Sequence, residues 1–268
     1  MRNRKWRVLS LLLVAVMTLG ILFGCSKDGG EKGSGGKGGK KDTIIIATMA
    51  EPPTLSPTEQ NAIASSYMNA LTFSQLTRMN EDMEMEGALA ESFENTSETE
   101  WVFHLRKGVK FHNGEEMTAD DVVTSITYAK TCPEINLYNA SVEKIEKVDD
   151  YTIKITTPGP SAILLSDLAH HGNAIMPKKL LDEGHNFSTD PIGTGPYKHV
   201  EWKRGDSLEF EIFEDYWDEE HMPSIKHMIW KIIPEGSSRT IALEAGEVDY
   251  IVDVEAMDVE RLEAADGI

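Results

Sequence analysis

The sequence predicts a mixed α and β fold, and three patterns lead to this prediction. Residues 43–49 (TIIIATM) form a nearly continuous run of β-branched side chains, which is typical of a strand buried on both faces. Residues 101–105 (WVFHL) and 151–155 (YTIKI) place apolar side chains at every second position, as half-buried strands do. Between them, Thr118 precedes two acids and an apolar stripe with helical spacing, which predicts a capped helix.

The first predicted strand and the helix after it open the folded body. Pro52 and Pro53 end the strand, because proline cannot continue a hydrogen-bonded ladder. We expect the next helix over residues 65–76. Its predicted packing side consists of Tyr67, Ala70, Leu71 and Ser74.

The helix after Thr118 should bury Val122, Ile126 and Ala129 and should end before Pro133. A second, shorter helix is expected over residues 162–168. Further along, Pro191–Tyr197 (PIGTGPY) predicts a rigid turn that leads into a strand pair. The remaining expected elements are a hairpin bend at 203–206, a strand over 225–233, a helix over 237–245 closed by Gly246, and a strand over 248–252.

The amino-terminal segment has the features of an export signal that ends at a cysteine. Residues 1–24 combine a basic start with an apolar middle that is shorter than the ~20 residues needed to span a bilayer. Leu22, Gly24 and Cys25 resemble the lipobox of bacterial lipoproteins, in which cleavage precedes a cysteine that carries lipid. We therefore predict a signal peptide over 1–24 and lipid attachment at Cys25. A transmembrane anchor with an incidental cysteine is the alternative.

Glycine and lysine dominate residues 25–41, and almost no apolar side chain occurs there. Such a segment cannot bury enough surface to offset its ordering entropy, so we predict a flexible linker. Lipid, linker and folded body together would place the protein at the extracytoplasmic face of the cell membrane.

The charge of the chain excludes one large class of partners. Acidic residues number 45 against 26 basic ones, for a net charge of −19. Nucleic acid is disfavoured as a partner, because the sequence has no basic stripe that would displace counterions. If Cys25 carries lipid, no disulfide can form within the chain, and Cys132 is expected to be a small buried apolar group.

The sequence offers little that resembles a catalytic or metal-binding motif. It has no His-Glu-x-x-His, no Gly-x-Ser-x-Gly and no cysteine pair at metal spacing. His170 and His171 could bind a metal, but an adjacent pair in a loop is more often structural. The acids at 115–116 and 120–121 flank a predicted helix start, where the helix dipole favours carboxylates. We therefore predict no enzymatic activity, no cofactor and no bound metal.

A resemblance to a known family extends over residues 43–266. The blocks that carry it are Leu89–Phe93, Trp101–Gly114, Thr118–Val123, Pro191–Tyr197, Asp215–Trp217 and Leu243–Asp249. In this order they resemble the extracellular solute-binding proteins of family 5, which serve oligopeptide, dipeptide and nickel uptake by ATP-binding-cassette (ABC) importers. The blocks point to the family and not to one ligand.

The resemblance implies a periplasmic-binding-protein-like lobe of mixed α/β structure with an inserted subdomain. Residues 42–79 and 190–268 would form the base of this first lobe, and residues 80–189 the insertion. Family members continue through a second lobe, which is absent here. We therefore expect a fragment that is truncated at the hinge.

The resemblance also indicates where a solute would lie. In the family, the loop after the first strand borders the cleft, which points here to Met49, Glu51, Pro52 and Thr54. Tyr138 is the nearest candidate for an aromatic side chain that reaches the same cleft from the insertion. An ordinary role in a loop or in the core remains open for each of these residues.

These inferences lead to one main functional hypothesis. The chain would be the lipid-anchored, monomeric binding subunit of an ABC importer, capturing peptides and passing them to the permease subunits. The same fold binding nickel chelate, heme or a sugar is the first alternative. A non-functional truncated remnant, and a surface hydrolase suggested only by the acidic clusters, are the others.

Overall fold

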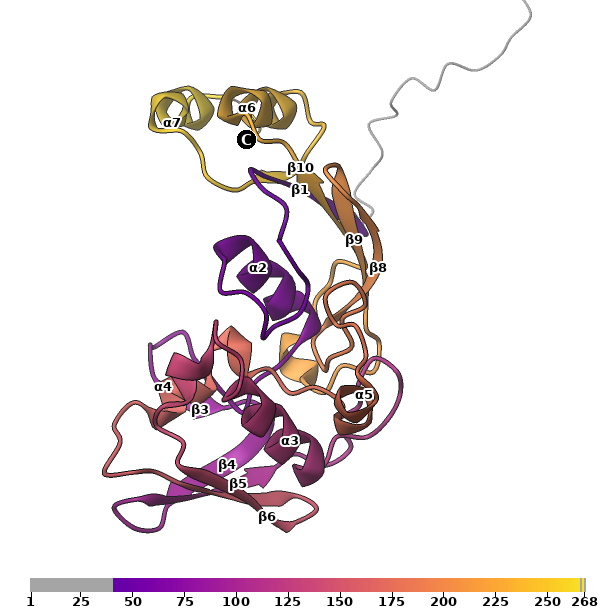
Figure 1. Ribbon diagram of the computed structural model, residues 1–268. Helices are drawn as coiled ribbons and strands as arrows, with labels where there is room; N and C mark the ends of the chain where they lie inside the picture. The colour runs from indigo at the N-terminus through magenta and orange to yellow at the C-terminus, as the bar shows by residue number, and fades with distance from the viewer. Residues whose placement is uncertain (1–40, 266, 268) are drawn as a thin grey trace, which may run out of the picture. The chain divides into compact units, whose positions relative to one another are not determined.

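Three β-sheets, of which one is only the two-stranded β2-β3 pair, and the helices around them make up residues 41–265 and 267, the part of the chain that the computed structural model describes (Figure 1). The larger sheet has the strand order β11-β1-β10-β9-β8. Its strands are β1 (Thr43–Thr48), β8 (Tyr197–Lys203), β9 (Ser207–Ile212), β10 (His227–Ile232) and β11 (Tyr250–Ile251). β1 runs parallel to β10 and β11, whereas β10, β9 and β8 are antiparallel neighbours. The sheet therefore joins two segments that are far apart in the sequence.

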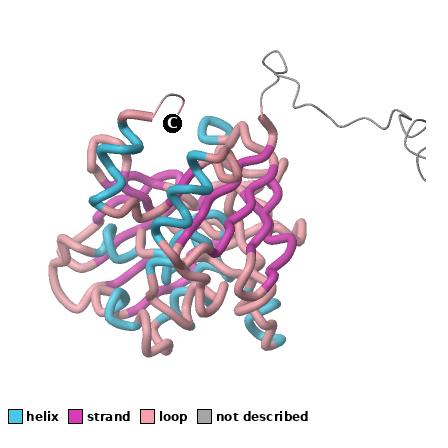
Figure 2. Tube along the Cα trace, turned by 90° about the horizontal axis from the view of Figure 1, so that it is seen from above, coloured by secondary structure: helices cyan, strands magenta, loops and turns pink. Residues whose placement is uncertain are grey.

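Strand β1 is covered on both faces, as its β-branched run predicted. Ile46 belongs to a cluster that includes Met68 of helix α2 (Ile63–Thr72). Its neighbour Ala47 points to the other face and packs with residues of helices α6 (Gly236–Glu244) and α7 (Ala256–Glu263). Figure 2 shows these two C-terminal helices lying beside the strands of the sheet. Alternate side chains of one strand thus connect two separate cores.

The second sheet has four strands in the order β4-β5-β7-β6. Their bounds are Ala90–Asn95 for β4, Glu100–Leu105 for β5, Lys144–Asp149 for β6 and Thr152–Thr156 for β7. Phe103, Ile153 and Ile155 are fully buried in its core, as the alternating pattern predicted. Helix α3 (Ala119–Ala129) lies over β6 and β7 and buries its apolar stripe in the same core (Figure 1).

The predicted cap at the start of α3 is present. One carboxylate oxygen of Asp121 accepts hydrogen bonds from the Thr118 backbone N–H at 2.8 Å and from the Thr118 hydroxyl at 3.1 Å. The shorter elements complete the described chain. They are β2 (Thr77–Met79), β3 (Met85–Gly87), η1 (Asn136–Asn139), α4 (Leu164–Leu168), η2 (His171–Asn173), α5 (Lys178–Glu183) and η3 (Glu219–His221).

Helix α2 differs from the prediction in its end and in its buried side. It ends at Thr72, because the Thr72 carbonyl accepts a hydrogen bond from the Gly195 N–H, at 3.0 Å, and not from the next turn of the helix. The buried residues are Ser65, Met68, Asn69 and Thr72, whereas the predicted Ala70 is exposed. Cys132 also departs from its prediction, because it is half-buried and not buried.

The turn at Pro191–Tyr197 holds the start of β8 against the loop that follows β5. The His112 N–H donates to the Gly193 carbonyl at 2.8 Å, and the His112 side chain lies 2.9 Å from the Gly195 carbonyl. A Cβ at Gly193 would lie 2.1 Å from the Thr72 carbonyl oxygen, so only glycine permits this close backbone approach. The turn is rigid because backbone groups on both sides hold it.

Candidate functional site

The loop between β1 and α2 contains most of the predicted solute contacts. The chain leaves the sheet after Thr48, and Met49 is 52% exposed. Pro52 and Thr54 turn inward and are buried, while Glu51 is half-buried. The structure therefore places Met49 on the surface and the other predicted residues partly or wholly inside the loop.

Glu51 fastens this loop to the hairpin between β8 and β9. Its Oε2 accepts a hydrogen bond from the Trp202 indole N–H at 3.1 Å and another from the Gly205 backbone N–H at 3.1 Å. Two donors on one carboxylate oxygen fix the side chain firmly. In this arrangement Glu51 positions the loop, and its contacts are made within the protein.

Thr54 stabilises the loop from within. Its Oγ1 accepts from the Ser56 N–H at 3.0 Å and donates to Glu59 Oε2 at 3.0 Å. Its carbonyl accepts from the Ser65 hydroxyl of α2 at 3.2 Å. Because Thr54 is only 6% exposed, these contacts support the loop from its inner side.

Tyr138, on η1, reaches the far end of the same loop. Its hydroxyl accepts a hydrogen bond from Asn61 Nδ2 at 3.0 Å, and Asn61 lies just before α2. The ring stacks on His170, with the ring centroids 3.6 Å apart and the planes 10° from parallel. The structure thus brings Tyr138 to the loop that holds Met49, Glu51, Pro52 and Thr54, though at its opposite end.

His170 and His171 lie next to Tyr138. The sequence suggested a structural role for this histidine pair. The rings of His170 and His171 are 4.1 Å apart, and His171 Nδ1 lies 3.4 Å from the Ser66 hydroxyl of α2. Burial, followed by the neighbouring His171, lowers the pKa of His170 to about 4, and burial lowers the pKa of His171. Both imidazoles are therefore neutral at pH 7. We call Tyr138, His170 and His171 together the aromatic stack.

One atom of the aromatic stack is not satisfied. His171 Nε2 is buried and has no hydrogen-bond partner among the described residues. A buried imidazole nitrogen without a partner is costly unless a group from outside supplies the bond. The adjacent histidines were visible in the sequence, but their stacking on Tyr138 was not, because no local pattern indicates it.

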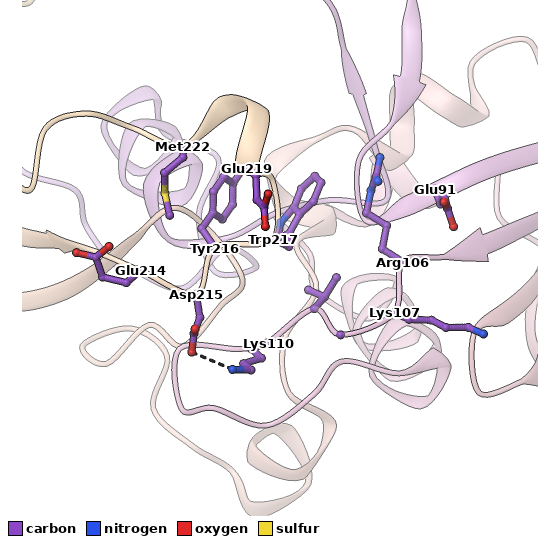
Figure 3. A pocket seen from close by; sticks show the side chains of 12 residues that line it. Glu91, Arg106, Lys107, Lys110, Glu214, Asp215, Tyr216, Trp217, Glu219 and Met222 are labelled. Carbon is purple, nitrogen blue, oxygen red and sulfur yellow. Dashed lines mark hydrogen bonds and ion pairs between the residues drawn. The ribbon is translucent and has the colours of Figure 1, made fainter.

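A separate, open pocket of about 750 Å³ lies away from this loop, between the turn after β5 and residues 214–222 (Figure 3). One wall carries Arg106, Lys107 and Lys110, and the facing segment carries acids. Lys110 pairs with Asp215 at 3.0 Å. None of the predicted site residues lines this pocket.

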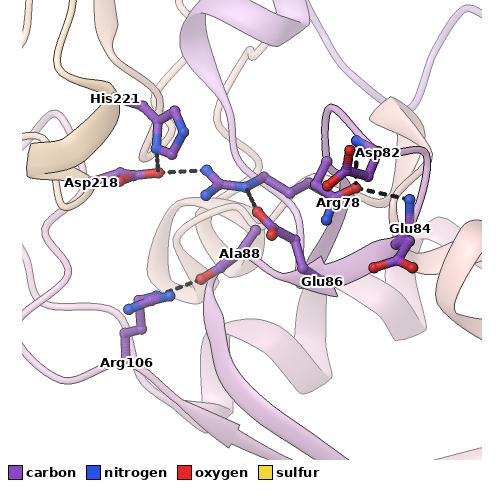
Figure 4. A network of polar contacts seen from close by, with 9 residues as sticks. Arg78, Asp82, Glu84, Glu86, Ala88, Arg106, Asp218 and His221 are labelled. Carbon is purple, nitrogen blue, oxygen red and sulfur yellow. Dashed lines mark hydrogen bonds and ion pairs between the residues drawn. The ribbon is translucent and has the colours of Figure 1, made fainter.

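A polar network beside this pocket holds the β2–β3 hairpin to residues 214–222 (Figure 4). The Arg78 guanidinium donates to Glu86 at 2.6 Å and to the buried carboxylate of Asp218. Asp218 also lies 3.0 Å from His221 Nδ1. Burial opposes the charge of Asp218, but Arg78 and then His221 outweigh it and keep the pKa of this carboxyl below its usual value.

Two features are absent from the described residues. No helix among residues 41–265 is both long and apolar enough to cross a membrane. In that same part of the chain, no group of three or more His, Cys, Asp or Glu residues is arranged to hold a metal ion. The predicted lipid site at Cys25 lies outside the described residues.

Comparison with known proteins first identifies the family to which the chain belongs. Residues 84–268 match the family described as "Bacterial extracellular solute-binding proteins, family 5 Middle". The chain belongs to this family, and both the resemblance and the predicted periplasmic-binding-protein fold are confirmed.

Particular relatives then show the range within the family. The chain is 29% identical to the oligopeptide-binding protein AppA of Bacillus subtilis, over 98% of this chain and 50% of AppA. It is 29% identical to the glutathione-binding protein GsiB of Pectobacterium atrosepticum, over 84% of this chain and 44% of GsiB. The chain thus spans about half the length of the curated relatives it matches.

Solved structures give the same result for the fold. AppA from Bacillus subtilis in complex with a nonapeptide has a TM-score of 0.74 and 27% identity, covering 84% of this chain and 46% of AppA. NikZ from Campylobacter jejuni in complex with Ni(L-His) has a TM-score of 0.72 and 30% identity, covering 84% of this chain and 46% of NikZ.

Proposed function

We propose that this chain captures small solutes outside the cell for an ABC importer, and that its solutes are peptides. The observation that carries the proposal is the family match over residues 84–268. The choice of peptides is supported by the similarity to AppA, which extends over 98% of this chain. The relatives named above are binding proteins, in keeping with a protein that carries out no reaction of its own.

The proposed contact surface is the loop at Met49–Thr54 together with Tyr138 and the end of the loop at Asn61. Exposed apolar side chains support this choice, because Met49 is 52%, Ile63 72% and Leu137 74% exposed. Methionine is unbranched and adapts to ligands of different shape, which suits recognition of peptides with varied side chains. Glu51 and Thr54 would hold the loop in place while Met49 and Tyr138 meet the solute.

The remaining parts of the proposal concern location and organisation. Residues 1–24 would direct export, and lipid on Cys25 with the linker up to residue 41 would tether a monomer to the extracytoplasmic face of the membrane. Residues 42–79 and 190–268 would form the base of the first lobe, with 80–189 inserted. Permease subunits of the importer would be the protein partners.

Thermal unfolding with a panel of solutes tests the proposal. A ligand that binds only the folded state raises the melting temperature by mass action. We expect a pool of nonapeptides at millimolar concentration to raise the melting temperature, and Tyr138→Leu to reduce that rise. Glutathione, a nickel–histidine chelate, heme and a sugar complete the panel. If one of them stabilises the chain while the peptides do not, the peptide assignment is wrong.

A nickel–histidine chelate is the second candidate, because one observation favours it. His171 Nε2 is buried without a partner among the described residues, and NikZ was solved with Ni(L-His). Neutral imidazole nitrogen is a common ligand of nickel. If the chelate is the solute, His171→Gln should abolish its effect on the melting temperature, whereas the exposed substitution His104→Gln should not. Equal stabilisation of both variants would exclude His171 as the ligand.

A further inference from the structure

A small cavity of about 190 Å³ lies beside residues 56–59, and its lining includes none of the residues of the proposed solute surface. Three structural pieces form it: residues 56–59 of the loop, the C-terminal part of α3, and α5 with the segment that follows it. Its polar and aromatic lining residues are Ser56, Thr58, Glu59, Tyr128, His185 and Phe187. A cavity of ~150 Å³ is enough for a ring of six carbon atoms, so this one can take a ligand of similar size.

The inner wall of this cavity is polar, although its residues are buried. Ser56 and Thr58 are 3% and 2% exposed, and their hydroxyl oxygens lie 3.3 Å apart. Tyr128 lines the same cavity from α3. Burial, followed by the nearby Cys132, raises the pKa of Tyr128, so the phenol stays neutral at pH 7. The wall therefore presents uncharged hydroxyl oxygens that can accept hydrogen bonds.

One carboxylate lines the cavity. Glu59 contributes a carboxylate, of which Oε2 accepts from the Thr54 hydroxyl at 3.0 Å. The imidazole of His185 is engaged at its Nε2, 2.8 Å from the Asp190 carbonyl and 3.4 Å from the Asp190 carboxylate. Among residues 41–265, no lysine or arginine lines the cavity. A cation is thus the favoured occupant on electrostatic grounds.

The side chains that line the cavity indicate which kind of cation it can bind. A primary ammonium group has three N–H donors, and the Glu59 carboxylate with the Ser56 and Thr58 hydroxyls supplies oxygen acceptors for them. The rings of Tyr128 and Phe187 supply apolar surface for a short carbon chain and can attract the cation itself. From these contacts we propose that the cavity binds a small primary amine in its ammonium form.

Occupation of this cavity has a structural consequence for the loop. Glu59 and Thr54 are joined by a hydrogen bond, and Ser56 donates its N–H to the same Thr54 hydroxyl. A bound ammonium group would hold residues 54–59 in one arrangement. The existence of the site does not depend on the proposed function of the chain.

Isothermal titration calorimetry of the full chain with n-butylammonium tests this proposal, and 1-butanol is the uncharged control. We expect saturable binding of the amine and no heat from the alcohol. Glu59→Gln keeps the hydrogen bond from Thr54 and removes the charge, so it should weaken amine binding at least tenfold. Glu98→Gln, an exposed acid in a distant turn, should leave binding within twofold of the unaltered chain.

Two outcomes overturn the proposal. One is equal binding of amine and alcohol, and the other is a folded Glu59→Gln variant that binds within twofold of the unaltered chain. If Glu59→Gln fails to fold, Tyr128→Phe and Thr58→Val test the hydroxyl acceptors instead, since each removes one hydroxyl from the cavity, and amine binding within twofold of the unaltered chain by both would overturn the proposal as well. Competition by a peptide with a free amino terminus, but not by its N-acetylated form, would identify peptide termini as the source of the ammonium group. Lack of competition would identify free amines.

Discussion

Removal of Arg78 should destabilise the junction between the β2–β3 hairpin and residues 214–222. The Arg78 guanidinium sits between Glu86 and Asp218 (Figure 4), and the Asp218 side chain is only 8% exposed. Arg78→Met keeps much of the packing of the side chain but removes its charge and its donors. The Asp218 carboxylate would then retain His221 as its partner.

The size of the effect follows from the exposure of the two partners. Loss of one member of a fully buried ion pair costs ~3–5 kcal/mol, and loss of a surface pair costs ~0–1 kcal/mol. Because the Arg78 side chain is 31% exposed and Asp218 is 8% exposed, the change lies between these limits. We expect a loss of about 2 kcal/mol in the free energy of unfolding, or roughly 4–8 °C in melting temperature for a chain of this size.

Urea denaturation followed by circular dichroism measures this change. Lys144→Met is the matched control, because it removes an exposed pair with Glu146 whose side chains are 62% and 38% exposed. The control should lie within ~0.5 kcal/mol of the unaltered chain. An Arg78→Met variant as stable as the control would refute the conclusion that this network holds the junction together.

Three further predictions concern other parts of the chain. Gly193→Ala should cost on the order of 3 kcal/mol in urea denaturation, because its Cβ would overlap a backbone carbonyl, whereas Gly159→Ala meets nothing within 4 Å and should be neutral. Burial lowers the pKa of His112 to about 4, so between pH 6.5 and 4 only the unfolded chain binds this proton and stability falls as the pH drops. Between pH 6.5 and 4 the free energy of unfolding should fall by about 3 kcal/mol less in His112→Gln than in the unaltered chain. An unchanged pH profile would contradict this reasoning. Tyr138→Phe should raise the amide exchange rate around Asn61, since it removes their hydrogen bond, and an unchanged rate would count against that contact.

Local chemistry made much of the fold predictable. The capping residues at Thr118, the β-branched run of β1 and the alternation in β5 and β7 each indicate their element within a few residues. The pairing of β1 with β10 and β11 could not be predicted in this way, since register depends on contacts between distant residues. Helix α2 ends at Thr72 for the same reason, because a distant glycine N–H binds its last carbonyl.

The candidate site was predictable only in part. The resemblance indicated the loop at Met49–Thr54, but not that Glu51 would be held by Trp202 and Gly205. The contact between Asn61 and Tyr138 joins residues 77 apart, and the stack of His170 on Tyr138 likewise depends on the tertiary fold. Sequence patterns identify residue types that suit a role, whereas the partners that decide the role are set by packing.

The measurement that tests the central claim most directly is a nuclear magnetic resonance titration of the full chain with a pool of nonapeptides. We expect saturable shifts of the amide signals of Met49, Ala50, Glu51, Thr54, Asn61 and Tyr138, with no shift at the exposed turn around Glu98. Saturable shifts confined to the open pocket between Arg106 and Trp217, or no shift anywhere at millimolar peptide, would contradict it.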